Sequence, residues 1–100
     1  MKNFRTFDLA VEFYKFAKTL PLKGPVKNQF ARASLSISLN LAEGRGRKTL
    51  RDQRRFFDIA LGSLRECQAI MKIEGLNKTD EFKLLDRLGA SVYLLIKNAR

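Results

Sequence analysis

The chain has 100 residues, 45% hydrophobic and 30% charged, which is typical of one folded domain and excludes a disordered chain. It contains 20 Lys and Arg against 10 Asp and Glu, and the net charge of +10 favours a polyanionic partner such as nucleic acid or an anionic membrane surface. No His is present and Cys67 is the single Cys, which excludes imidazole catalysis, an internal disulfide and a cysteine-based zinc site.

The composition also predicts the compartment. No apolar run approaches the ~20 residues that a membrane-spanning helix needs, and the residues that follow Met1 lack the apolar stretch of a signal peptide. We therefore expect no membrane association, and the single Cys, which permits no internal disulfide, predicts a cytoplasmic protein.

Three groups of Pro, Gly and polar residues, at 21–25, 44–46 and 75–78, divide the chain into four stretches. Between these breaks the apolar residues recur about every 3.6 positions, the period of an amphipathic helix. We predict helices over 6–20, 25–43, 49–74 and 79–99, in a single domain over residues 1–100. Four helices with short connections predict an all-α fold, namely an antiparallel up-down-up-down four-helix bundle.

Each predicted helix carries an apolar stripe, which we assign to the core. The stripes are Leu9, Phe13, Phe16, Ala17 and Leu20; Val26, Phe30, Ala33, Ile37 and Leu41; Phe57, Ala60, Leu61, Leu64, Cys67 and Met71; and Leu85, Leu88, Val92, Leu95, Ile96 and Ala99. Thr49 and Thr79 are placed to cap the third and fourth helices, and Gly75 to end the third.

Further apolar residues lie outside these stripes, more than one bundle seam uses. They are Phe7, Val11, Tyr14, Leu35, Leu39, Phe56, Ile59, Ile70, Ile73, Leu84, Tyr93 and Leu94. The surplus favours a second buried surface, most simply a contact between identical subunits. The alternative is that scattered apolar residues on a small domain have no special role.

The strongest local feature is the basic segment 45–55. It holds six basic residues, Arg45, Arg47, Lys48, Arg51, Arg54 and Arg55, and one acidic residue, Asp52. The spacing of Arg51, Arg54 and Arg55 places them on one helical face, and planar guanidinium groups suit phosphate. We therefore predict nucleic-acid binding here. The alternative is a solvated helix start in which Arg54 pairs with Asp58.

Four polar or small residues invite a structural interpretation. Asn40 is expected to cap or cross-link helices, and Glu43 to accept a hydrogen bond from a backbone amide or from an arginine of the basic segment. Gly44 belongs to a Gly-x-Gly turn that lacks the features of a phosphate loop. Gly62 lies within the third helix, where its cost in helix propensity points to a close helix crossing. We predict no catalytic residue, metal or cofactor, because no second carboxylate or nucleophile matches Glu43.

Two stretches carry a family resemblance. The first has Arg32-Ala33 and Ser36-Ile37 and closes with Asn40-Leu41-Ala42-Glu43-Gly44. The second has Phe56, Ile59-Ala60, Gly62-Ser63 and Glu66. Together they resemble the signature of the four-helix-bundle proteins encoded in 23S rRNA intervening sequences, along the whole chain. One departure is Ser38, where many relatives have Pro.

The resemblance implies a four-helix bundle that assembles as a homopentamer. It also implies kinship with the accessory variability determinant of diversity-generating retroelements, a basic pentameric barrel that binds nucleic acid and a reverse transcriptase. A third function, an enzyme such as a nuclease acting on the rRNA insert, is disfavoured because the sequence offers neither clustered carboxylates nor His for its site. Two functions are favoured by the sequence and the resemblance. The first is a non-enzymatic, oligomeric protein that binds RNA or DNA, with RNA favoured. The second is an interaction scaffold or accessory subunit that docks a protein such as a reverse transcriptase.

Overall fold

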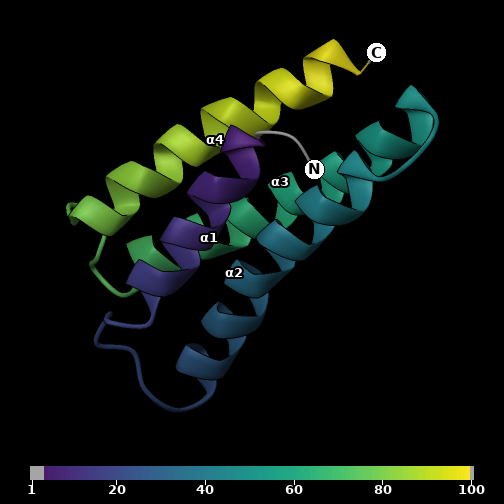
Figure 1. Ribbon diagram of the computed structural model, residues 1–100. Helices are drawn as coiled ribbons and strands as arrows, with labels where there is room; N and C mark the ends of the chain where they lie inside the picture. The colour runs from purple at the N-terminus through teal and green to yellow at the C-terminus, as the bar shows by residue number, and fades with distance from the viewer. Residues whose placement is uncertain (1–3, 100) are drawn as a thin grey trace.

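A computed structural model describes residues 4–99, which form four α-helices (Figure 1). They are α1 (Arg5–Ala17), α2 (Gly24–Arg45), α3 (Leu50–Ile73) and α4 (Asp80–Asn98). Helix α2 packs against α1 and α3, and α4 packs against the same two helices, so that the four contacts close a ring around one core. The all-α prediction is confirmed, and α2 continues without a break through Ser38.

The first helix is shorter than predicted: it ends at Ala17, whereas the prediction placed its end at residue 20. The Thr19 hydroxyl and the Thr19 amide both bond the Phe16 carbonyl, at 2.7 and 3.0 Å. A threonine side chain that bonds the backbone locally competes with helix continuation. Pro21 also disfavours helical backbone at the residue before it.

The predicted helix ends around α3 and α4 are confirmed. The Thr49 hydroxyl accepts from the Asp52 amide at 3.1 Å, and the Thr79 hydroxyl accepts from the Phe82 amide at 3.2 Å. Helix α3 ends at Ile73, and Gly75 follows its C-cap Glu74 with a φ of +74°, in the left-handed region that favours glycine. The Leu76 amide then bonds the Met71 carbonyl at 2.7 Å, which satisfies a carbonyl of the last helical turn.

The core is built from the predicted stripes, with two exceptions. Phe16 remains 47% exposed and Val26 36% exposed. The buried face of α1 follows Phe13 and Ala17, and Phe16 is rotated away from that line by the helical step. Val26 lies in the first turn of α2, at the edge of the bundle.

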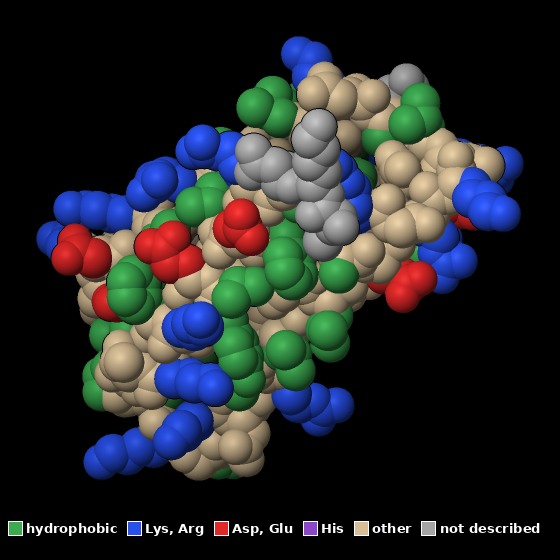
Figure 2. Space-filling view, in the orientation of Figure 1, with side chains coloured by type: hydrophobic (Ala, Val, Ile, Leu, Met, Phe, Trp, Pro, Cys, Tyr) green, Lys and Arg blue, Asp and Glu red, His purple; other side chains and the backbone are tan. Residues whose placement is uncertain are grey.

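The surplus apolar residues divide into three groups, of which one, Val11, Tyr14 and Phe56, is half-buried. Leu84 is 5% exposed, so its placement outside the core was wrong, and Phe7 and Ile70 pack against the core from its margin. Six others keep a large exposed area: Leu35, Leu39, Ile59, Ile73, Tyr93 and Leu94. Figure 2 shows hydrophobic side chains gathered over α1 and α2 on one face of the molecule. An exposed apolar surface therefore accompanies the buried core.

Within residues 4–99, no helix combines the length and the apolar character that crossing a membrane requires.

Candidate nucleic-acid interface

The short connection between α2 and α3 is held tightly against the bundle. A Cβ added to Gly44 would lie 2.7 Å from Cε1 of Phe57, closer than real Cβ contacts allow, and 3.1 Å from the Gln53 carbonyl oxygen, which is tighter than most such contacts. The Gln53 side-chain amide also donates to the Arg47 carbonyl at 3.0 Å. Gly44 and Gln53 thus bring the end of α2 against the start of α3, and the basic segment surrounds this junction.

Arg51, Arg54 and Arg55 lie together, as their spacing predicts. They line one open hollow of about 420 Å³, with Asp52 and Asp58 as its other lining residues. The predicted alternative of an ion pair between Arg54 and Asp58 is wrong, because the ion pairs among the described residues are Arg47–Glu43 and Lys83–Asp80. Three arginines and two aspartates therefore line one hollow, and their formal charges leave it net positive.

Arg47 is fixed by two contacts. Its Nη2 atom donates to Oε2 of Glu43 at 2.6 Å, and its guanidinium carbon lies 4.7 Å from the centre of the Phe56 ring. The guanidinium carbon of Arg55 lies 4.5 Å from the same ring centre. Two cations therefore share one aromatic ring, whose negative face attracts both. The interpretation of Glu43 as the acceptor for an arginine of the basic segment is confirmed.

The remaining members of the segment lie apart from this group. The guanidinium carbon of Arg45 lies 4.8 Å from the centre of the Phe4 ring. Lys48 is exposed in the connection. The six predicted residues thus surround the α2–α3 junction without forming a single flat face.

Asn40 and Gly62, the two other predicted structural residues, do not line the arginine hollow. The Asn40 side-chain amide donates to the Ser36 carbonyl at 2.9 Å and to the Ser36 hydroxyl at 3.1 Å, and Ser36 hydrogen-bonds Ser63 of α3 at 2.8 Å. Asn40 therefore supports the cross-link between α2 and α3 through Ser36. The close helix crossing predicted at Gly62 is wrong, because a Cβ there would meet no atom within 4 Å.

A close crossing does occur at two other glycines. Gly44 meets Phe57 as described above, and a Cβ on Gly89 of α4 would lie 3.3 Å from a Leu64 methyl group. Gly62 is exposed on the outer face of α3. Its position in the sequence alone does not indicate which face of the helix it occupies.

Cys67 is buried in the core, and this burial raises the pKa of its thiol to about 12, with a smaller contribution from the nearby charge of Glu66. The protonated thiol is a weak nucleophile. In residues 4–99, no group of three or more Cys, Asp or Glu side chains is placed to hold a metal ion.

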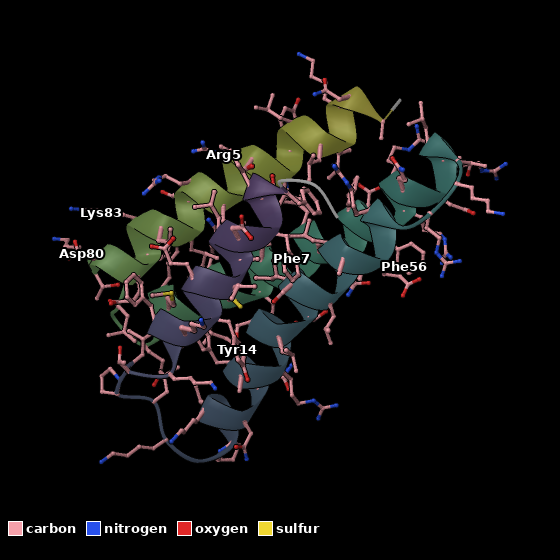
Figure 3. The ribbon with its side chains drawn as sticks, in the orientation of Figure 1. Arg5, Phe7, Tyr14, Phe56, Asp80 and Lys83 are labelled. Carbon is pink, nitrogen blue, oxygen red and sulfur yellow. The ribbon has the colours of Figure 1, made fainter. Side chains whose placement is uncertain are left out.

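The sequence interpretation missed the aromatic partners of the arginines. Phe56 was assigned to the surplus apolar set, and Phe4 received no role. Phe56 is adjacent to Arg55 in sequence, but Arg47 reaches the ring only because the chain turns between α2 and α3. Figure 3 shows Phe56 and the pair Asp80 and Lys83 at opposite ends of the molecule.

The fold and the site define a class: a basic protein of four α-helices with an arginine-rich helix junction. Residues 4–93 match the family described as 23S rRNA-intervening sequence protein, and the chain belongs to this family. This match confirms the resemblance seen in the sequence motifs. No match was found among curated proteins.

Proposed function

We propose that this protein is a non-enzymatic, basic homo-oligomer that binds the backbone of nucleic acid, preferentially RNA, in the cytoplasm. The observation that carries the proposal is the hollow that Arg51, Arg54 and Arg55 line together. Like charges this close repel one another, and an anion placed between them relieves that repulsion. Guanidinium groups bind phosphate oxygens through paired hydrogen bonds, so a phosphate backbone is the matching ligand.

One further arginine, Arg47, extends the same end of the molecule and shares the Phe56 ring with Arg55. Arg47 and Arg55 are held on Phe56, so less side-chain freedom is lost when they bind a ligand. Figure 2 shows Lys and Arg side chains around the α2–α3 end of the visible face. Lys48 and Arg45 complete a cationic surface around the junction.

The proposed architecture is an antiparallel up-down-up-down bundle that assembles into a homopentamer. The short connections support the alternating direction, because consecutive helices contact each other. The exposed Ile59, Ile73, Tyr93 and Leu94 support a subunit contact. The pentamer itself rests on family membership, and light scattering tests it: a monomer at micromolar concentration would contradict it.

The second candidate is an accessory subunit that docks another protein, such as a reverse transcriptase. The exposed apolar residues favour it, since they suit a protein surface as well as a second copy. Co-purification after nuclease treatment separates the candidates. A partner protein that remains bound supports docking, and one that is lost supports an RNA link.

The binding experiment measures affinity for single-stranded RNA by filter binding across a salt series. The first double variant, Arg51→Gln with Arg54→Gln, removes two charges from the hollow. A matched control, Lys72→Gln with Lys78→Gln, removes two exposed charges near the opposite end of α3. Each lost phosphate contact lowers the slope of log affinity against log salt by about 1, so the arginine variant should lose about 2 and the control almost none.

Two results would contradict the proposed interface. Binding that does not weaken with salt excludes phosphate contacts as the source of affinity. An equal loss of slope in the lysine control would place the binding surface elsewhere on the molecule.

A further inference from the structure

A second hollow, distinct from the one lined by Arg51, Arg54 and Arg55, lies at the end of α2. It has a volume of about 490 Å³ and is lined by Leu39, Ala42, Glu43, Gly46 and Arg47. Leu39 is 59% exposed, so its side chain offers an apolar surface to whatever enters. Gly46 has no side chain to block the entry. One apolar wall and one charged wall thus border the same open space.

The charged wall is already ordered. Arg47 donates to Oε2 of Glu43 at 2.6 Å, which leaves Oε1 and the second lone pair of Oε2 as acceptors. The Phe56 ring, which does not line the hollow, also contacts the Arg47 guanidinium, whose central carbon lies 4.7 Å from the ring centre. The guanidinium and carboxylate groups therefore present a plane for stacking and a hydrogen-bond acceptor side by side.

We propose that this hollow binds one unpaired nucleobase and prefers guanine, an inference that rests on the proposed function. Unpaired bases stack on aromatic or guanidinium planes and are read through their Watson–Crick edges. Here Arg47 supplies the plane, Leu39 and Ala42 the apolar contact, and Glu43 the reading group. Leu39 is thereby assigned to the base and not to a contact between subunits.

Glu43 selects guanine because of hydrogen-bond geometry. The Watson–Crick edge of guanine carries two adjacent donors, N1–H and the N2 amino group, which match the two oxygens of a carboxylate. Adenine and cytosine each place an amino donor beside a ring-nitrogen acceptor, which a carboxylate repels. In uracil a single N–H lies between two carbonyl oxygens. A base in a duplex is not read in this way, because its Watson–Crick edge is occupied by pairing.

The experiment uses fluorescence anisotropy with short oligouridylates that carry one central guanosine, adenosine or inosine. One well-formed pair of hydrogen bonds to a base changes affinity by about ten-fold or more, so guanosine should exceed adenosine by that factor. Inosine lacks only the N2 amino group and should fall between them. Equal affinity for all three oligonucleotides would overturn the proposal.

A matched pair of variants tests the role of Glu43. Glu43→Gln and Glu74→Gln both remove one exposed negative charge, and Glu74 follows the far end of α3. Both should raise affinity for the adenosine oligonucleotide by a similar small factor, because each reduces repulsion of phosphate. Only Glu43→Gln should remove the difference between guanosine and inosine. A difference that survives Glu43→Gln would overturn the proposal.

The outcomes separate this inference from the proposed function. Salt-dependent binding without a preference among the bases overturns the base site and leaves phosphate binding intact. Absence of binding to every oligonucleotide overturns both. Circular dichroism checks that Glu43→Gln is folded, and the comparison of guanosine with inosine on the unmodified protein tests the site without any variant.

Discussion

The two connections that flank α3 are built alike and charged differently. Each leads into a helix capped by a threonine, Thr49 at 3.1 Å and Thr79 at 3.2 Å from the amide that it accepts. Residues 45–55 contain six basic residues and one acidic residue, whereas residues 72–83 contain three of each. The same capping chemistry therefore operates in a strongly cationic and in a balanced setting.

The positive charge at the α2–α3 junction is therefore not needed to start a helix. A capping threonine starts α4 among acidic residues of its first turn, Asp80 and Glu81, which suit the positive end of a helix dipole. At the start of α3, Arg51 lies in the same turn as Asp52 and opposes that dipole. A feature that folding does not favour is a candidate for binding.

The two connections also use glycine for different reasons. Gly75 provides a φ of +74°, and Gly44 provides space beside Phe57. The first need is conformational and concerns the local backbone. The second is steric and exists only because α3 packs against α2.

The largest change in stability is expected from a substitution at Gly44, the glycine that is needed for space. Gly44→Ala places a Cβ 2.7 Å from the Phe57 ring, and overpacking of this kind should lower the free energy of unfolding by about 2 kcal/mol. Urea denaturation followed by far-UV circular dichroism measures the loss. Gly46→Ala is the control, because its Cβ would have no neighbour nearer than 3.7 Å. Equal losses in both variants would contradict the steric explanation.

The next effect tests whether the two caps are equivalent. Thr49→Ala and Thr79→Ala each remove one side-chain acceptor at a helix start and should each lower the unfolding free energy by about 1 kcal/mol. The matching serine variants retain the hydroxyl and should recover most of the loss. A cost confined to one of the two sites would show that the connections differ in more than charge.

The smallest change in stability is expected at Gly62, which lies in α3 between the two connections. Because a Cβ there meets no atom within 4 Å, Gly62→Ala should add helix propensity without a clash and raise the unfolding free energy by about 0.8 kcal/mol. Thermal and urea unfolding measure the gain. A net loss of stability would contradict the open surroundings of this residue.

Much of the fold was predictable because helices are encoded locally. Periodicity located all four helices, and Thr49, Thr79 and Gly75 were assigned from their residue types alone. The end of α1 was misplaced because the Thr19 bond to Phe16 depends on a local competition that periodicity does not register. The exposure of Phe16 and the burial of Leu84 depend on which neighbouring helix covers each face.

The candidate site was predictable in composition but not in geometry. The sequence by itself determined the charge of the 45–55 segment, the common face of Arg51, Arg54 and Arg55, and the family motifs, because these are properties of residue type and helical spacing. Only the tertiary structure decided that Phe56 supports Arg47 and Arg55, that Gly44 is the close crossing and that Gly62 is open. The contact of Arg47 with Phe56 and that of Gly44 with Phe57 arise where the end of α2 meets α3. Local spacing along one helix does not specify which side chain of the neighbouring helix lies opposite.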